Sequence, residues 1–201
     1  MFRFLLPFAL LLLAAAASAA QTVLVFGDSL SAGFGIGIEQ SWPALLGKRL
    51  EAEKSPYTVA NASISGETTA GGRSRLPAAL ERFHPSVVVV ALGANDGLRG
   101  LPPEQMRDNL VAMIRAVHQR KARVLLVGIK LPPNYGSDYT ARFEETYRSV
   151  AKQEKTVLLP FLLEPIALDN AAYLPDGLHP IASAQPKILD HVWKALKSLL
   201  K

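Results

Sequence analysis

Apolar residues form short continuous runs along the chain, and each run has the length of a β-strand. The clearest run, residues 87–92, contains six apolar residues in succession. A run with no polar residue is typical of a parallel strand that is buried on both faces. The same criterion predicts strands at residues 22–26, 57–60, 87–92, 124–129 and 157–159.

The segments between these runs have apolar residues at helical spacing. Met106, Leu110, Met113 and Val117, for example, fall on one face of a helix. Pro77 is expected to break one of these helices, because proline lacks the backbone N–H that an inner turn needs. The predicted helices cover residues 42–53, 69–83, 102–119, 139–153 and 180–200. Alternating strands and helices predict an α/β fold, a three-layer α/β/α sandwich with a flavodoxin-like, five-stranded parallel sheet.

The first twenty residues do not fit this alternation. They contain 17 hydrophobic residues and a single charge, Arg3, and they end in the small residues Ala17-Ser18-Ala19. The apolar run at residues 5–13 is shorter than the roughly 17 residues that a membrane-spanning helix needs. Residues 1–20 are therefore predicted to be a secretory signal peptide, cleaved near Ala19 or Ala20, and residues 21–201 a single domain. An uncleaved anchor is the alternative.

Composition narrows the possible functions of that domain. The chain of 201 residues has no cysteine, which excludes disulfide scaffolds, zinc fingers and cysteine nucleophiles. Loss of Arg3 with residues 1–20 lowers the net charge from +5 to +4. The charges are scattered, so no nucleic-acid partner is expected. We expect the protein to be exported, either to the periplasm or out of the cell. After cleavage it is expected to have no stable membrane anchor and to be a monomer.

Polar segments follow several of the predicted strands, where ligands bind in parallel sheets. They are residues 27–31 (GDSLS), 61–68 (NASISGET) and 93–96 (GAND), with 176–179 (DGLH) near the end of the chain. In this order they resemble the four motifs of the GDSL, or SGNH, serine hydrolases. Residues 95–100 and 131–136 further resemble its bacterial periplasmic branch of multifunctional thioesterases, lysophospholipases and arylesterases. The resemblance covers nearly all of residues 21–201 and implies the SGNH hydrolase fold.

The resemblance assigns catalytic roles to Ser29, Asp176 and His179. A serine hydroxyl needs an adjacent base to act as a nucleophile at neutral pH. His179 is the expected base, and Asp176, three residues earlier, can hold its other ring nitrogen. Without the resemblance, these residues would be read as turn and helix-capping residues.

The resemblance also assigns three donors to an oxyanion hole. They are the backbone N–H groups of Ser29 and Gly66 and the side-chain amide of Asn95. Such donors stabilise the negative oxygen of a tetrahedral intermediate. Asp28 and Asp96 are expected to accept hydrogen bonds from loop N–H groups and to take no part in proton transfer.

An acyl pocket should be apolar with few polar groups. Its expected walls lie on loops near the motifs and are Leu30, Phe34, Leu98, Leu101, Leu131, Pro132, Tyr135 and Leu178. The predicted substrates are small molecules, namely acyl esters and thioesters, with fatty acyl groups favoured, or lysophospholipids. Two alternatives remain open, a carbohydrate O-acetyl esterase of the same superfamily and a non-catalytic acyl- or lipid-binding protein. No metal and no cofactor are expected; the glycine-rich residues 33–38 lack the last glycine of a dinucleotide-binding loop.

Overall fold

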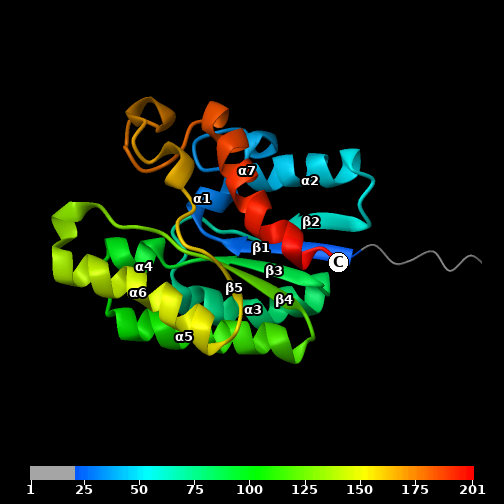
Figure 1. Ribbon diagram of the computed structural model, residues 1–201, viewed down its shortest axis with the longest axis horizontal. Coiled ribbons are helices and arrows are strands. Elements are labelled where there is room, and N and C mark those ends of the chain that lie inside the picture. The colour runs from blue at the N-terminus through cyan, green and yellow to red at the C-terminus, as the bar shows by residue number, and fades with distance from the viewer. Residues whose placement is uncertain (1–20) are drawn as a thin grey trace, which may run out of the picture.

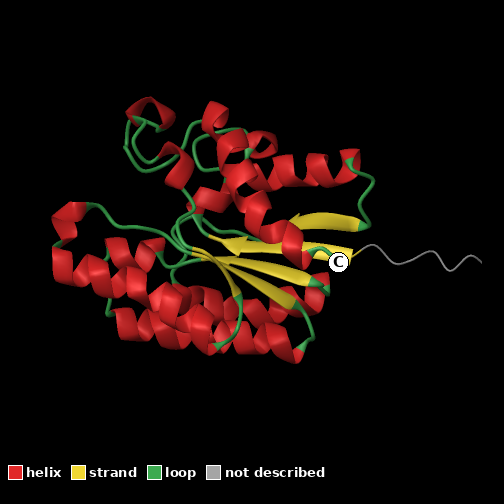
Figure 2. Ribbon diagram, in the orientation of Figure 1, coloured by secondary structure: helices red, strands yellow, loops and turns green. Residues whose placement is uncertain are grey.

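The computed structural model describes residues 21–201, so the predicted signal peptide and its cleavage site lie outside the described residues. A parallel sheet forms the middle layer of the structure, with helices on both faces (Figures 1 and 2). Its strands are β1 (Gln21–Gly27), β2 (Tyr57–Asn61), β3 (Val87–Ala91), β4 (Arg123–Val127) and β5 (Val157–Leu159). The strand order is β2-β1-β3-β4-β5, and every pairing is parallel. The predicted three-layer, flavodoxin-like fold is confirmed.

Helices of each layer pack on the sheet through their apolar faces. In Figure 1, α2 and α7 cover one face of the sheet, whereas α3, α5 and α6 cover the other. The helices are α1 (Ser29–Ala32), α2 (Trp42–Ala52), α3 (Thr69–Phe83), α4 (Ala94–Leu98), α5 (Pro103–Gln119), α6 (Ser137–Gln153) and α7 (Gln185–Leu196). All five residues of β3 are buried, as expected for a central strand covered on both sides. No helix within residues 21–201 is long and apolar enough to cross a membrane.

Two helix predictions were wrong in detail. The helix α3 runs through Pro77 without a break. Pro77 and Arg73, whose carbonyl loses its helical partner, are both exposed, so water can satisfy that carbonyl. The helix predicted at residues 180–200 begins only at Gln185. Residues 180 and 181 instead pair with the segment 172–173, through a bridge between Tyr173 and Pro180 and a hydrogen bond from the Ile181 N–H to the Ala172 carbonyl.

The strand order places a topological switch point between β1 and β3. The chain turns from β1 toward β2 on one side and from β3 toward β4 on the other. The loops that follow these two strands therefore separate at the carboxyl edge of the sheet and leave a crevice, where α/β proteins bind ligands. Ser29 begins α1 directly after β1, and Asn95 lies in α4 directly after β3.

Candidate active site

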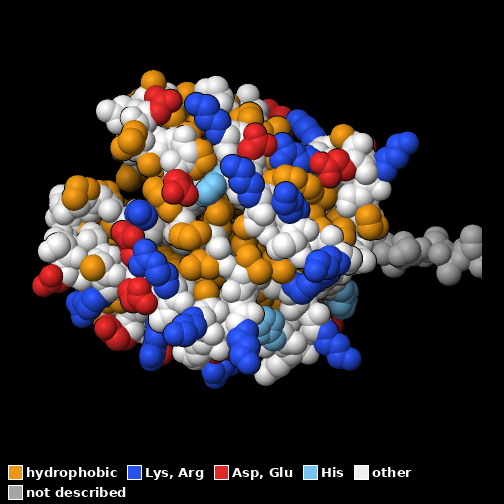
Figure 3. All heavy atoms as spheres, viewed as in Figure 1, with side chains coloured by type: hydrophobic (Ala, Val, Ile, Leu, Met, Phe, Trp, Pro, Cys, Tyr) orange, Lys and Arg blue, Asp and Glu red, His pale blue; other side chains and the backbone are white. Residues whose placement is uncertain are grey.

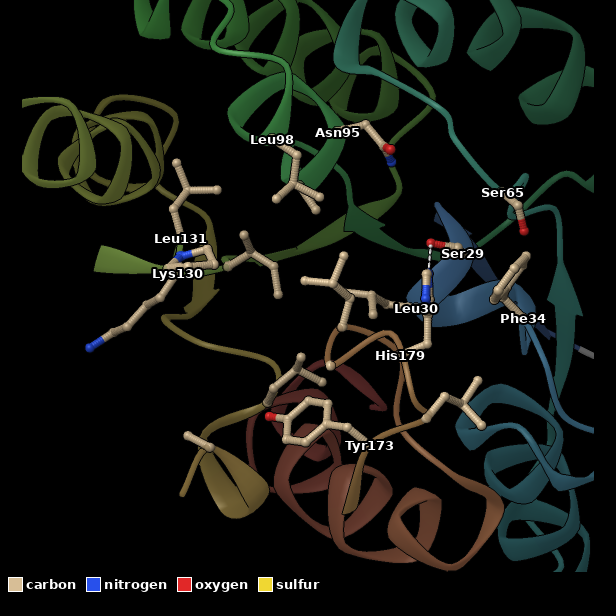
Figure 4. Close-up of a pocket in the computed structure, with 18 of the residues that line it drawn as sticks. Ser29, Leu30, Phe34, Ser65, Asn95, Leu98, Lys130, Leu131, Tyr173 and His179 are labelled. Carbon is tan, nitrogen blue, oxygen red and sulfur yellow. Dashed lines mark hydrogen bonds between the residues drawn. The ribbon is translucent and has the colours of Figure 1, made fainter. Parts of the chain in front are cut away.

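Ser29, His179 and Asp176 form a continuous chain of hydrogen bonds at this crevice. The Ser29 Oγ lies 2.9 Å from the His179 Nε2. The His179 Nδ1 lies 2.7 Å from the Asp176 Oδ2. An ionised carboxylate only accepts hydrogen bonds, so the Nδ1 carries the proton and the Nε2 is free to accept from the serine hydroxyl. Figure 4 shows the imidazole of His179 directed at Ser29.

The local fold fixes the position of Ser29. Asp28 is the N-cap of α1, and its carboxylate accepts a hydrogen bond from the Leu30 N–H at 3.0 Å. Gly33 ends this single turn in the left-handed conformation, with φ of +80°. The short turn presents the hydroxyl of Ser29 at the edge of the sheet. Asp28 thus has the loop-organising contact expected from the sequence.

The segment 172–181 holds His179 and Asp176. The Leu174 N–H donates to the His179 carbonyl at 2.7 Å, which closes the loop between them. The carboxylate of Asp176 also accepts the N–H groups of Leu178 at 2.9 Å and His179 at 3.0 Å. The pKa of Asp176 is lowered to about 2, mainly by the hydrogen bond from the backbone N–H of His179, then by that from the N–H of Leu178, and then by that from the side chain of His179. Asp176 is therefore ionised at neutral pH and keeps the imidazole in one orientation.

Phe34 covers one side of the imidazole. Its ring centroid is 4.4 Å from that of His179, and the two planes are inclined by 38°. Phe34 lies in the glycine-rich loop after α1, and about half of its surface is exposed. It limits the access of water to the His179 ring from that side.

Ser29, Gly66 and Asn95, the three residues expected to form the oxyanion hole, line one cavity together with His179. Gly66 has a φ of +80°, a conformation that glycine adopts without strain. One amide hydrogen of Asn95 is donated to the Glu67 carbonyl at 3.0 Å, which leaves the second available to a ligand. Within residues 21–201, the backbone N–H groups of Ser29 and Gly66 donate to no protein acceptor.

A set of side chains that the sequence did not reveal fixes the loop that carries Gly66. Arg75, on α3, donates from Nε to the Glu67 carboxylate at 2.8 Å and from Nη1 to the Ala62 carbonyl at 2.8 Å. Its guanidinium lies 4.2 Å above the ring of Phe26. On the other side, Arg99 donates to the Gly66 carbonyl at 2.9 Å. The loop is thus held from both sides of Gly66.

Asp96 links the loop of Asn95 to α3. Its carboxylate accepts the Thr69 N–H at 2.8 Å and the Thr69 hydroxyl at 2.5 Å. Burial raises the pKa of Asp96, and the hydrogen bonds from Thr69 oppose that rise. Asp96 thus accepts a hydrogen bond from a backbone N–H, as expected from the sequence.

A cavity of about 890 Å³ extends from Ser29 between the loops at the carboxyl edge. Six of the eight predicted walls line it, namely Leu30, Phe34, Leu98, Leu131, Pro132 and Leu178. Figure 4 shows Leu98 and Leu131 on one side of Ser29, and Phe34 and Ser65 on the other. Volumes of about 300–1,000 Å³ are typical of small-molecule sites.

Leu101 and Tyr135 do not line this cavity, and their prediction as pocket walls was wrong in geometry. The Tyr135 hydroxyl donates to the Leu98 carbonyl at 3.0 Å, so its ring braces that loop from behind. The Leu101 N–H donates to the Asp96 carbonyl, and the Leu101 carbonyl accepts the Tyr139 hydroxyl. These bonds tie Leu101 to α4, through Asp96, and to α6, through Tyr139.

Sequence reasoning missed the part of the cavity that follows β5. Its members lie in a segment of mostly irregular structure, and they are Phe161, Leu163, Ala167, Asn170, Tyr173 and Leu174. One signal could have found them, because they follow an apolar run at the same edge of the sheet as the recognised motifs. No group of histidine, aspartate and glutamate residues within 21–201 is arranged to hold a metal ion.

Comparisons with known proteins identify the family of this chain. The model of the GDSL-like Lipase/Acylhydrolase family matches residues 25–185. Esterase TesA of Pseudomonas aeruginosa is 52% identical over 183 residues, which cover 91% of each chain. Thioesterase 1/protease 1/lysophospholipase L1 of Escherichia coli is 44% identical over 200 residues, covering 99% of this chain and 95% of that protein.

A solved structure shows the same likeness in three dimensions. The psychrotrophic esterase EstA from Pseudoalteromonas sp., inhibited by monoethylphosphonate, superposes with a TM-score of 0.86 at 39% identity. The match covers 90% of this chain and 98% of that one. The fold and the site define a hydrolase with a serine–histidine–aspartate arrangement. The chain belongs to the GDSL-like lipase/acylhydrolase family, and it is an acyl hydrolase.

Proposed function

We propose that Ser29 is the nucleophile of this hydrolase, with His179 as its general base and Asp176 as the group that orients the imidazole. The observation that carries the proposal is the chain of hydrogen bonds at 2.9 and 2.7 Å that connects the three side chains. His179 takes the proton of Ser29 as the hydroxyl attacks the acyl carbon. Asp176 stabilises the imidazolium that forms.

The tetrahedral oxygen is stabilised by the Ser29 and Gly66 N–H groups and by the free amide hydrogen of Asn95. His179 then donates its proton to the leaving alcohol or thiol, and an acyl-enzyme on Ser29 remains. A water molecule, deprotonated by His179, releases the acid and restores the serine. Each step uses only groups of this chain, and we therefore propose that the monomer is active.

The proposed substrates are fatty acyl esters, acyl thioesters and lysophospholipids. Leucine, proline and phenylalanine side chains dominate the walls that the cavity shares with the loops after β3, β4 and β5. Such walls suit an acyl chain. The names of the relatives, esterase TesA and thioesterase 1/protease 1/lysophospholipase L1, support the same classes.

We propose that the protein acts in the periplasm or outside the cell. The composition of residues 1–20, with one charge and an apolar run before small residues, supports export. Amino-terminal sequencing of the protein recovered from the periplasm tests this proposal. A first residue near Ala20 or Gln21 is expected, and an intact Met1 would contradict it.

Covalent labelling tests the assignment of the nucleophile. A fluorophosphonate probe should label the parent protein and should not label Ser29→Ala, because only an activated serine reacts at a useful rate. Ester hydrolysis by Ser29→Ala should fall by at least about 10³-fold. Ser31→Ala is the matched control, since Ser31 is a buried serine two positions away that does not line the cavity. Labelling of Ser29→Ala at the parent rate would contradict the proposal.

A panel of substrates separates the proposed classes from the carbohydrate O-acetyl esterase. Acetyl, octanoyl and palmitoyl esters of p-nitrophenol, with the matching thioesters, vary acyl length and leaving group independently. A higher kcat/KM for octanoyl than for acetyl esters is expected, because the cavity continues beyond Ser29 between apolar walls. A strict preference for acetyl groups would favour the O-acetyl esterase. A parent protein that neither hydrolyses nor reacts with the fluorophosphonate would be the non-catalytic binding protein.

A further inference from the structure

The large apolar side chains that the structure exposes all lie at one edge of the molecule. Within residues 21–201 they are Phe34, Ile38, Ile64, Leu168 and Leu178, with exposed fractions of 49%, 72%, 47%, 99% and 40%. We call these five residues the apolar rim. They belong to the loops that follow β1, β2 and β5, so they share the carboxyl edge of the sheet. Single exposed apolar residues are ordinary, whereas their collection on one edge is not.

Four residues of the apolar rim lie at the cavity or directly next to residues that line it. Phe34 and Leu178 line the cavity themselves. Ile64 directly precedes the lining residues Ser65 and Gly66, and Leu168 directly follows Ala167, another lining residue. The two sides of the rim come from segments that lie far apart in the sequence. A surface that touches the rim would therefore face the opening through which substrate enters.

The form of the rim suits a lipid surface better than a protein partner. Its side chains project from separate loops, and Leu168, at the turn after β5, is almost completely exposed. Isolated side chains on loops can enter a layer of lipid headgroups, where apolar surface is removed from water. A stable protein interface needs instead a continuous packed patch.

The charge of the molecule favours anionic lipid. Glu39 and Asp169 adjoin Ile38 and Leu168. Lys130 lines the cavity, and Arg99 bonds to the carbonyl of the lining residue Gly66, so the rim itself is close to neutral. The attraction comes from the net charge of +4 of residues 21–201. Figure 3 shows lysine and arginine side chains spread over the visible face. Such a field draws the protein to a negative surface and weakens with salt.

We propose that the apolar rim docks the enzyme on a lipid–water surface that contains anionic headgroups. The cavity mouth then faces the layer that holds acyl chains, so a substrate can pass from that layer to Ser29 without crossing bulk water. The proposal rests on the proposed function and specifies where its acyl substrates are bound. It identifies lipid aggregates, rather than dispersed monomers, as the preferred form of substrate.

Vesicle sedimentation tests the docking without turnover. The Ser29→Ala protein is mixed with vesicles of phosphatidylcholine alone or with about one third phosphatidylglycerol. Addition of Ile38→Ser and Leu168→Ser, two rim residues that do not line the cavity, should weaken binding to the mixed vesicles by about tenfold. The matched control carries Ala52→Ser and Ala78→Ser, exposed positions on α2 and α3, and should bind like Ser29→Ala alone. Binding should weaken in 0.5 M salt, because the Debye length is then only about 4 Å and the attraction between the protein and the anionic headgroups is screened.

Activity measurements connect the docking with catalysis. With Ser29 intact, Ile38→Ser/Leu168→Ser should hydrolyse dissolved p-nitrophenyl acetate at the parent rate. Its hydrolysis of lysophosphatidylcholine held in mixed vesicles should fall about tenfold. Equal vesicle binding by the rim variant and the control would overturn the proposal. So would light scattering that shows a parent dimer, dissociated by the rim substitutions, together with no vesicle binding.

The failure of this inference differs from the failure of the proposed function. If the parent hydrolyses dissolved esters but does not sediment with vesicles, only the docking is wrong. If the parent sediments through the rim but hydrolyses no ester or thioester, the proposed function is wrong and the lipid-binding surface remains.

Discussion

Asp28 is a buried carboxylate directly beside the proposed nucleophile. Only 2% of its surface is exposed. Burial raises the pKa of Asp28 to about 6, and the opposing effects of the Leu30 N–H and of the charge on His179 are smaller. At neutral pH, Asp28 is therefore mostly ionised in spite of its burial. Its negative charge favours the imidazolium form that His179 adopts during the proposed reaction.

Replacement of Asp28 by Asn should change how stability depends on pH. The unfolded chain has a pKa near 3.8 for this group, so the folded parent binds the proton more tightly and loses stability as Asp28 ionises between about pH 4 and pH 6. Asp28→Asn lacks this loss. Relative to the parent, the free energy of unfolding of Asp28→Asn should rise by about 2 kcal/mol over that range and then level off above it.

Urea unfolding followed by circular dichroism between pH 4 and pH 8 measures this difference. Asp138→Asn, an exposed position in the first turn of α6, is the control and should show no such rise. A stability difference between Asp28→Asn and the parent that stays constant with pH would contradict the assignment. Hydrolysis by Asp28→Asn should also be slower, because the imidazolium loses a nearby negative charge.

Ser29 and Asn95 could be located because each stands in a short polar motif at a strand end, and His179 because residues 176–179 resemble a motif of a known hydrolase family. It could not reveal Arg75, since an arginine on a helix surface is ordinary in composition. Nor could it show that Phe34 covers the imidazole of His179, because that contact joins residues 145 positions apart whose pairing depends on the fold. Local patterns thus identified the candidate reacting groups, while the groups that position them required coordinates.

At the scale of elements, the apolar runs placed all five strands to within two residues. Buried parallel strands leave this signal because both faces need apolar side chains. The helix ends were less accurate, and the start of α7 is the clearest case. The side chain of Gln185 accepts the Trp42 N–H at 2.9 Å, and the preceding residues close the loop of His179. A tertiary contact therefore sets where this helix begins, and periodicity cannot predict it.

The contact of α3 with the Gly66 loop has a testable effect on turnover. In Arg75→Met, the loop loses its bonds to the Glu67 carboxylate and the Ala62 carbonyl, while an apolar side chain still covers Phe26. The Gly66 N–H should then be less well placed for the oxyanion. We expect kcat to fall about tenfold with little change in KM, a fraction of the loss seen when an oxyanion donor is removed.

Steady-state kinetics on p-nitrophenyl butyrate, with the rate of phosphonate labelling, measures this effect. Arg73→Met on the exposed side of the same helix is the control and should keep the parent kcat. Arg75→Lys should recover part of the rate, because one donor remains. An equal loss in Arg73→Met, or a loss in Arg75→Met that follows its thermal unfolding, would show that α3 affects only stability.

The substrate cavity is a property of the whole molecule. Its walls come from the loops after all five strands, and the loop after β2 contributes the fewest residues, Ser65 and Gly66. Residues near the motifs were predicted, whereas those between β5 and the motif at 176–179 were not, because that segment has no distinctive composition. The size of the accepted acyl chain therefore depends on how several distant loops meet, which no single motif encodes.

Leu98 offers a way to test where the acyl chain lies. Its side chain is half-buried and reaches into the cavity between Asn95 and Leu131 (Figure 4). A phenylalanine at this position would fill part of the space beyond Ser29. Acetyl esters end before that region, so Leu98→Phe should leave their kcat/KM near the parent value. For octanoyl and palmitoyl esters, kcat/KM should fall by about 10- to 100-fold, the range expected when a pocket loses space for a few methylene groups.

Phe34→Leu provides the comparison from the opposite side of Ser29 (Figure 4), where we expect the leaving group to lie if the acyl chain passes Leu98. It should change the dependence on the alcohol or thiol and leave the ratio of octanoyl to acetyl rates unchanged. If Leu98→Phe lowers the rates for all acyl lengths equally, the chain does not pass Leu98. If Phe34→Leu alters the octanoyl-to-acetyl ratio instead, the acyl chain lies along the side of Ser29 that Phe34 and Ser65 form, and the two halves of the cavity exchange their functions.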